Sequence, residues 1–260
     1  MKKKIDIVYY PSFKNYIIFS DNIKLFHKII DKVYQAPLFP KKNNSINLIF
    51  FKNLFKSNIV FKIFLFWISI GFNSLSNKSI AKECKKLKIK HEKINSISEI
   101  KLKKNQYLIA SVSEIIPKKF LSKSKNILTP HEGQIPEWRG SALYVHYMVS
   151  KFKYARSTLF FTGKKLDIPR EINCKSKSIE IKNNTVIDLW YKLIYGSKEN
   201  VFSFFNDYFY KNKVKKLKIR INKKYKIFTF PNSKNFQDLK KNKVKFFSLN
   251  NVKKLILFNE

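Results

Sequence analysis

Short apolar runs alternate with segments of helical periodicity along most of the chain. Strand-length apolar runs occupy 5–10, 46–51, 63–72, 107–113 and 157–162. Apolar residues recur every three or four positions in 21–34, 76–87, 142–149 and 185–194, and 201–210 continues as an aromatic helix. Strands that alternate with helices predict an α/β fold with a Rossmann-like, mostly parallel sheet covered by helices.

The pattern changes near residue 214. Residues 217–221 and 225–230 each alternate apolar and polar side chains, and three polar residues separate them, which is typical of a β-hairpin. A turn and a short helix follow in 231–241. We therefore expect an α/β domain over 1–213 and a small β-rich C-terminal appendage over 214–260.

The stretch 126–140 carries the candidate chemistry. Ile127 and Leu128 form a short strand that leads into His131 and a turn-rich loop. Ligands of open α/β sheets bind at the carboxyl ends of strands, where a histidine can act in acid–base or oxyanion chemistry, although a lone histidine is more often structural. Asp167 follows the strand 157–162. If that strand runs parallel to 127–131, we expect His131 and Asp167 to meet at one edge of the sheet. The carboxylate would then fix the tautomer of the imidazole. The alternative is that Asp167 is a solvated loop residue.

This stretch resembles the signature loop of the folate-dependent formyltransferases. Members of that family carry Asn-x-His, a short turn, Leu-Pro, two variable residues and Arg-Gly. The corresponding residues here are Thr129-Pro130-His131, Ile135-Pro136 and Arg139-Gly140. Leu108–Pro117 resembles the family strand that ends in an Ile-Pro turn, and Leu166-Asp167 falls where the family has its catalytic aspartate. The similarity covers 107–193.

The resemblance implies formyl transfer from 10-formyltetrahydrofolate to a primary amine, with an amino sugar (a nucleotide sugar, for example) or another small amine as acceptor. It implies that His131 and the residue at position 129 stabilise the oxyanion while Asp167 keeps the histidine charged. The pterin is expected against the segment formed by Val112, Ser113, Ile115, Ile116 and Pro117. The alternatives are a methionyl-tRNA formyltransferase, which usually has a larger C-terminal domain, and a degenerate, non-catalytic binding protein.

Several residues depart from the family pattern. Thr129 stands in place of the asparagine and has a shorter reach, and Pro169 replaces a glycine and removes a backbone donor. Glu132 adds a charge directly after His131, either as a ligand for the amine or as a solvated side chain.

Three more loop residues are candidates for substrate binding. Trp138 can stack on a ligand ring or cover the underside of the loop. Arg139, which precedes Gly140, can pair with a carboxylate or phosphate that is internal or belongs to the ligand.

Composition narrows the partners. The net charge is +37, but only four of the 54 basic residues are arginine, the residue that nucleic-acid readers prefer, so we attribute the charge to low-GC coding drift. A tRNA acceptor is therefore less favoured than a small amine. A third interpretation is a lysine-rich nucleic-acid-binding protein that catalyses no reaction.

Cysteine usage and hydropathy bear on the compartment. Two cysteines without CxxC spacing predict a reducing compartment and no metal site. The longest apolar stretch, 59–72, is shorter than the ~20 residues of a membrane span, and no signal peptide is evident. We expect a cytoplasmic protein with no membrane partner; the sequence leaves the oligomeric state open.

Overall fold

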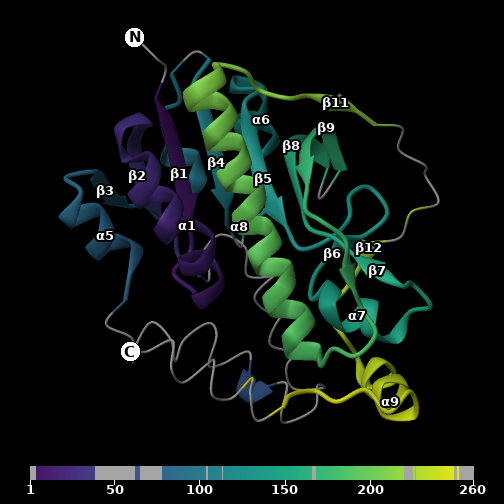
Figure 1. The fold of residues 1–260 in the computed structure, drawn as a ribbon. Helices are drawn as coiled ribbons and strands as arrows, with labels where there is room; N and C mark the ends of the chain where they lie inside the picture. Colours follow the sequence, from purple (N-terminus) through teal and green to yellow (C-terminus); the bar gives the residue numbers. More distant parts are fainter. Residues whose placement is uncertain are drawn as a thin grey trace.

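An eight-stranded sheet organises the computed structural model, which describes residues 4–38, 62–64, 78–103, 105–112, 114–165, 168–219, 225, 227–248 and 251 (Figure 1). The strand order is β11-β9-β8-β5-β4-β1-β2-β3. The bounds are β1 Ile5–Tyr9, β2 Ile30–Gln35, β3 Lys90–Lys93, β4 Tyr107–Ser111, β5 Ile127–His131, β8 Thr158–Lys165, β9 Ile168–Lys175 and β11 Leu217–Lys218. Two short ladders pair β6 (Arg139–Gly140) with β12 (Ile227–Phe228), and β7 (Tyr154–Ala155) with β10 (Ile179–Glu180).

The strand directions confirm the predicted fold class. Strands β3, β2, β1, β4 and β5 run parallel to one another. Strands β8, β9 and β11 extend the sheet by antiparallel pairs. The expectation that 157–162 runs parallel to 127–131 is wrong, because β8 pairs with β5 in the antiparallel sense, with His131 opposite Thr158. Strand β8 also continues through Gly163, where the sequence predicted its end.

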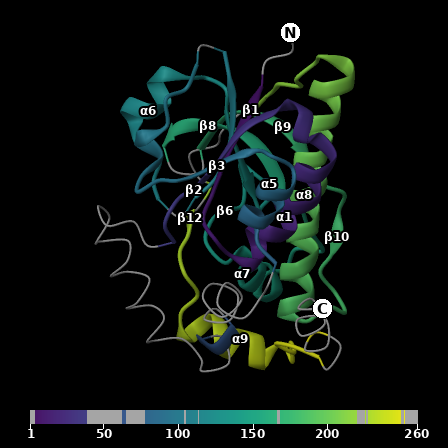
Figure 2. The same ribbon diagram turned by 90° about the vertical axis from the view of Figure 1, so that its left-hand side faces the viewer.

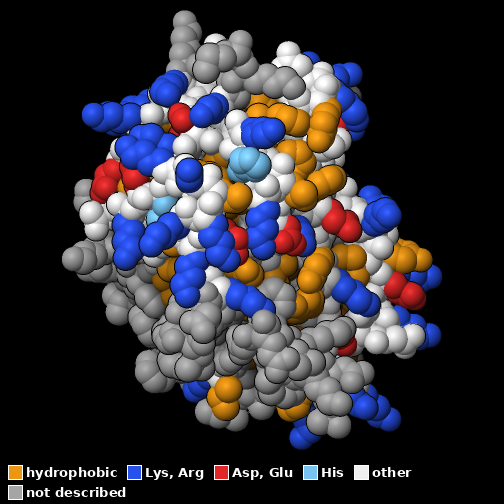
Figure 3. All heavy atoms as spheres, turned by 60° about the vertical axis from the view of Figure 1, so that its left-hand side comes forward, with side chains coloured by type: hydrophobic (Ala, Val, Ile, Leu, Met, Phe, Trp, Pro, Cys, Tyr) orange, Lys and Arg blue, Asp and Glu red, His pale blue; other side chains and the backbone are white. Residues whose placement is uncertain are grey.

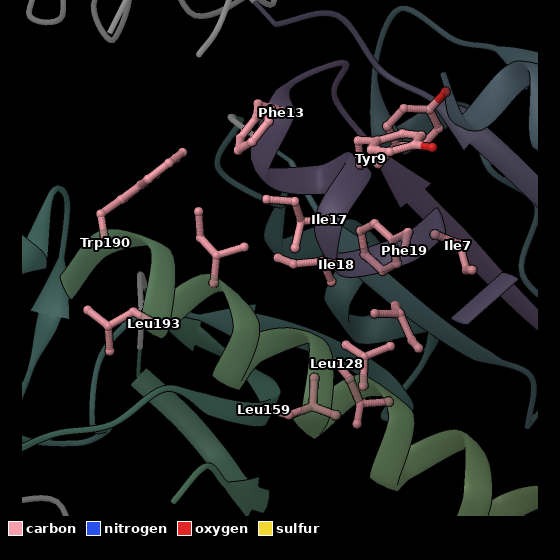
Figure 4. Packing of buried hydrophobic residues seen from close by; sticks show 14 of the residues in the cluster. Ile7, Tyr9, Phe13, Ile17, Ile18, Phe19, Leu128, Leu159, Trp190 and Leu193 are labelled. Atoms are coloured by element: carbon pink, nitrogen blue, oxygen red, sulfur yellow. The ribbon is translucent and has the colours of Figure 1, made fainter. Parts of the chain in front are cut away.

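Helices cover both faces of the sheet. Helices α1 (Phe13–Phe26) and α8 (Val186–Lys211) lie side by side on one face, and α6 (Lys118–Lys123) lies on the other (Figure 2). Successive side chains of the central strands point to opposite faces of the sheet, so each strand contributes to the hydrophobic cluster on either face. Ile7, Ile109 and Leu128 pack into the cluster beneath α1 and α8 (Figure 4), whereas Val8, Leu108 and Ile127 pack into the cluster beneath α6.

The remaining helices are short. They are η1 (His27–Ile29), α5 (Ile80–Lys86), η3 (Ile97–Glu99), α7 (Leu143–Val149) and α9 (Ser233–Lys241). The predicted helix over 142–149 is confirmed with Ala142 as its N-cap. The helices expected over 185–194 and 201–210 are one helix, α8, which begins with a capping box between Thr185 and Asp188.

The predicted helix over 21–34 is confirmed over 21–26, but its bounds are wrong. Helix α1 begins at Phe13, because the Ser12 side chain accepts the Asn15 N–H, and it ends at Phe26. The apolar residues of 30–35 belong to β2, which pairs in parallel with β1. Spacing of apolar residues alone did not separate a helix from the strand that follows it.

The predicted C-terminal hairpin is also wrong. Residues 217–218 pair with 171–172 of β9, and residues 227–228 pair with 139–140, so the two segments do not pair with each other in the described part of the chain. The amide groups of Val186 and Ile187 donate to the carbonyl oxygens of Lys245 and Phe246 at 3.1 Å. The C-terminal segment is therefore attached to the α/β domain by backbone hydrogen bonds.

Some predictions fall outside the described residues. These include the strand over 46–51 and most of the strand over 63–72, of which the described piece, 62–64, is a helical turn. Ser76, the predicted cap of the next helix, is also outside, and Ser79 caps α5 by accepting the Lys82 N–H. Within the described ranges, no helix combines the length and apolarity that a membrane span needs.

Candidate functional site

The carboxyl ends of β1, β4 and β5 meet at one edge of the sheet. Strand β1 lies between β2 and β4, so the connections reverse direction there, and such a switch point is where open α/β sheets bind ligands. Buried Asn15 joins the two strand ends at this point. Its Nδ2 donates to the Tyr10 carbonyl at 2.8 Å, and the Ser111 hydroxyl donates to its Oδ1 at 2.6 Å.

His131 lies at the carboxyl end of β5, partly exposed, as the sequence predicted. Its Nε2 lies 3.2 Å from the carbonyl oxygen of Trp138. A carbonyl only accepts, so Nε2 carries a hydrogen and Nδ1 is the nitrogen left for chemistry. Among the described residues Nδ1 has no hydrogen-bond partner. Nδ1 is an acceptor when the ring is neutral and a donor when the ring is charged.

Gly133 lets the loop fold back over the histidine. A Cβ at this position would lie 2.4 Å from the Trp138 carbonyl oxygen, 2.3 Å from Leu143 Cδ1 and 3.0 Å from His131 Nε2. Any side chain would therefore push the loop away from the imidazole. The glycine is required by this close approach, and the hydrogen bond from His131 depends on it.

Thr129 holds the place of the family asparagine and is hydrogen-bonded inside the protein. Its hydroxyl oxygen lies 2.8 Å from that of Thr162 on β8, and either oxygen can be the donor. If Thr162 donates, the Thr129 hydrogen is free to point at a ligand. If Thr129 donates, it has no hydrogen left for an oxyanion.

Glu132 is largely buried and not solvated. It forms an ion pair with Lys14, in the first turn of α1, and the two side chains are 15% and 21% exposed. Burial, with Glu132 as the next cause, raises the pKa of the Tyr144 hydroxyl, so Glu132 also faces α7. The ion pair therefore connects the β1–α1 turn to the residue that follows His131.

Trp138, Arg139 and Gly140 have partners inside the protein. The Trp138 ring stacks on Tyr147 at 3.9 Å and on Phe228 at 4.7 Å. Arg139 is 5% exposed, and its Nη2 donates to the Tyr225 carbonyl. Of the two roles open for Trp138, this geometry favours covering the underside of the loop. It likewise favours internal partners for Arg139, and contact of these residues with a substrate stays a prediction.

The segment expected to bind the pterin leaves β4 at the same edge. Glu114 anchors it, because its carboxylate accepts from Ser96 Oγ at 3.1 Å and from the Ile97 N–H. Ile115 is half exposed, and no backbone hydrogen bond joins Val112, Ile115 or Ile116 to a described residue. Pro117 is the N-cap of α6. Ser113 lies outside the described residues, and contact of this segment with the pterin stays a prediction.

The strand direction from which the meeting of His131 and Asp167 was predicted is wrong. Strand β8 runs antiparallel to β5, and Asp167 itself lies outside the described residues. The role predicted for Asp167 therefore rests on the family resemblance alone. The sequence reasoning also missed Lys14, Asn15 and Thr162. Ser12 is a typical helix N-cap, and it could have placed Lys14 and Asn15 in the first turn of a helix at this edge. The sequence carries no comparable signal for Thr162.

Metal ligands do not gather in the described part of the chain, where no group of three histidine, cysteine or acidic side chains could hold an ion. Burial raises the pKa of the Cys84 and Cys174 thiols to about 12. The two cysteines are thus poor nucleophiles at neutral pH.

No family model and no curated protein matches the sequence, but solved structures match the fold. An N-formyltransferase from Helicobacter canadensis, solved with folinic acid and dTDP-3-aminofucose, has a TM-score of 0.58 at 14% identity over 88% of this chain and 71% of that one. A 4-N-formyltransferase from Francisella tularensis has a TM-score of 0.56 at 16% identity, covering 87% and 76%. Phosphoribosylglycinamide formyltransferase from Anaplasma phagocytophilum has a TM-score of 0.51 at 12% identity, covering 80% and 88%.

The chain has the fold of the formyltransferases. This confirms, for the fold, the resemblance carried by residues 126–140. In this formyltransferase fold, His131 ends the strand that lies beside β4, and the segment 112–117 leaves β4 at the same edge. His131 and the segment 112–117 therefore lie at the same edge of the sheet, and they form the candidate site.

Proposed function

We propose that the chain transfers a formyl group from 10-formyltetrahydrofolate to a primary amine, an amino sugar or another small amine. The observation that supports this proposal is the geometry of His131 at the edge of the sheet where this fold binds ligands. Its Nε2 is fixed by the Trp138 carbonyl, and its Nδ1 has no hydrogen-bond partner among the described residues. A nucleotide-linked amino sugar is the first acceptor to test, because the Helicobacter enzyme was solved with one.

The bound folate supplies an electrophilic formyl carbon and a nitrogen leaving group. Charged His131 donates Nδ1–H to the oxygen that becomes negative as the amine attacks, and Nε2–H keeps the ring in place through Trp138. Thr129 donates a second hydrogen bond when Thr162 serves as the donor of their pair. Asp167 keeps His131 charged, a role that rests on the family resemblance.

Glu132 supplies the negative charge for the amine. Its carboxylate is already paired with an alkylammonium, that of Lys14, which is the chemical class of the proposed acceptor. A carboxylate next to His131 orients the amine and accepts its proton after attack. The bond between the formyl carbon and the folate nitrogen would then break, and that nitrogen would leave with a proton. The ion pair fits this role better than the solvated position that was the alternative.

The experiment is a formyl-transfer assay with 10-formyltetrahydrofolate and a panel of acceptors: dTDP-amino sugars, glycinamide ribonucleotide and methionyl-tRNA. Cofactor conversion is followed by absorbance, and the product is identified by a mass gain of one formyl group. Conversion with an amino sugar supports the proposal. Absence of folate binding at high micromolar concentration would remove the enzyme interpretation and favour the degenerate binding protein, which Thr129 and Pro169 suggest.

The net charge of +37 keeps methionyl-tRNA as a second candidate. On the face shown in Figure 3, however, lysine and arginine side chains are interspersed with acidic and apolar ones and do not form a single basic patch. Weak, non-specific binding of polyanions loses affinity steeply with salt. A tRNA complex that survives physiological salt would favour the tRNA acceptor.

A further inference from the structure

We propose that Phe228 is a positioning residue for His131, and that Tyr225, Phe228 and Thr229 act as a strap that holds the loop 131–141 in its working shape. This inference rests on the proposed function for its kinetic readout. It gives the C-terminal segment a role in the site, although that segment begins far along the chain from the histidine.

Backbone contacts fasten the strap to the loop. Strand β12 pairs in parallel with β6, with Phe228 opposite Gly140, and the Phe228 carbonyl accepts the Ser141 N–H at 3.0 Å. Gly140 has φ of 111°, and a Cβ there would lie 1.9 Å from the Phe228 carbonyl oxygen. Only glycine permits this backbone conformation together with the close approach of the Phe228 carbonyl, so Gly140 allows the strap to pack against the loop.

Side chains of the loop and of α7 add two hydrogen bonds to the strap. Buried Arg139 donates from Nη2 to the Tyr225 carbonyl, while its Nε has no hydrogen-bond partner in the described part of the chain. His146 Nε2 lies 2.8 Å from the Thr229 carbonyl and therefore donates to it. A buried guanidinium with few partners is costly, so removal of the strap would destabilise the loop at Arg139.

Two contacts connect the strap to the imidazole. The Phe228 ring stacks on the Trp138 ring at 4.7 Å with an interplanar angle of 7°. The carbonyl oxygen of the same Trp138 accepts the hydrogen bond from His131 Nε2 at 3.2 Å. Loss of the Phe228 ring frees Trp138 to shift, and a shift of Trp138 moves the group that fixes the orientation of His131.

The folate segment has separate anchors, which gives the inference a specific kinetic signature. The segment 112–117 is held by Glu114, which accepts from Ser96 and Ile97, and its described residues make no hydrogen bond to the strap. We therefore expect Phe228→Ala to lower kcat by about 10- to 100-fold, the scale of small misplacements in a site, while the KM for folate stays unchanged. Phe228→Tyr, which keeps the stacked ring, should restore kcat.

The test compares Phe228→Ala and Phe228→Leu with Phe247→Ala, which truncates a phenylalanine of the same segment that is 46% exposed. The second readout is the ring-proton NMR signal of His131, assigned by its loss in His131→Ala. The inference predicts a changed His131 signal and a lower kcat in both Phe228 variants, with Phe247→Ala unchanged. Phe228→Leu retains apolar volume and serves where Phe228→Ala does not fold.

Two results would overturn the inference: an unchanged His131 signal in folded Phe228→Leu, or an equal loss of kcat in Phe247→Ala. If the wild-type chain transfers no formyl group, the proposed function fails. The His131 signal then still decides whether Phe228 positions the imidazole, so the two failures are distinguishable.

Discussion

The hydroxyl oxygens of Thr129 and Thr162 lie 2.8 Å apart between β5 and β8. One of the two hydrogens lies in this bond, and the other is free. The free hydrogen is on Thr129, where the formyltransferase signature has an asparagine, only when Thr162 donates within the pair. Whether that donor serves an oxyanion is open to a direct mutational test.

Thr129→Val removes the hydroxyl and keeps the shape of the side chain. We expect kcat to fall by about 100- to 1,000-fold, as for other single oxyanion donors, with little change in the melting temperature. Thr129→Asn should retain or raise kcat, because it restores the family residue. The measurement is steady-state formyl transfer.

Thr162→Val is the matched variant, since it removes the other hydroxyl of the same pair. It leaves Thr129 free to donate, so we expect a loss of kcat well below that of Thr129→Val. Equal losses in the two variants would mean that the pair only holds β5 and β8 together.

Lys14 and Glu132 allow a second test, in which stability and binding are separated. Lys14→Met leaves the Glu132 carboxylate buried without its partner and should lower the free energy of unfolding by about 1–3 kcal/mol. Glu132→Gln should raise the KM for the amine, because the acceptor loses its counter-charge, while the KM for folate stays the same. Urea unfolding and steady-state kinetics measure the two effects.

A double-mutant cycle supplies the control for this pair. If the two side chains interact as the structure shows, Lys14→Met with Glu132→Gln should cost less than the sum of the single changes. Additive losses of stability would contradict the ion pair, and an unchanged KM for the amine in Glu132→Gln would remove Glu132 from the acceptor site.

Asp6 in β1 makes stability depend on pH. Burial, and then the charge of Asp31, raises the pKa of Asp6 to about 7 in the folded chain, whereas an aspartate in the unfolded chain titrates near its usual value of about 4. The folded state thus binds the proton more tightly, and the stabilisation present below pH 4 is lost as the pH rises toward 7. The free energy of unfolding should fall over this window by at most about 1.4 kcal/mol per pH unit.

Asp6→Asn isolates this contribution, since asparagine stays neutral and its Oδ1 can still accept the Lys32 N–H that Asp6 accepts at 3.2 Å. The variant should flatten the pH dependence between about pH 4 and 7 in urea unfolding. A slope equal to that of the wild-type chain would show that Asp6 does not carry it.

The sequence was sufficient for features that depend on local pattern. Residues 5–9 and 107–111 are strands because continuous apolar runs of that length suit a sheet buried on both faces. His131 was placed at a strand end by the short apolar run before it and the turn residues after it. These signals lie within a few residues of the feature they predict.

Features that depend on distant partners could not be predicted. Strand β8 is antiparallel to β5, and no pattern within 157–162 distinguishes the two directions. The alternation in 217–221 and 225–230 predicted strands, and 217–218 and 227–228 are strands. Their partners are β9 and β6, which are distant in sequence. The sequence left Glu132 open between an amine ligand and a solvated side chain, because its partner Lys14 comes from another element.

The central claim is that the imidazole of His131 stabilises the formyl-transfer adduct, and one measurement tests it most directly. Formyl transfer to a dTDP-amino sugar is compared between the wild-type chain and His131→Ala, with circular dichroism as a check that the variant is folded. The account predicts a formylated product with the wild-type chain and loss of turnover in the folded variant. Turnover that is unchanged in His131→Ala would contradict it.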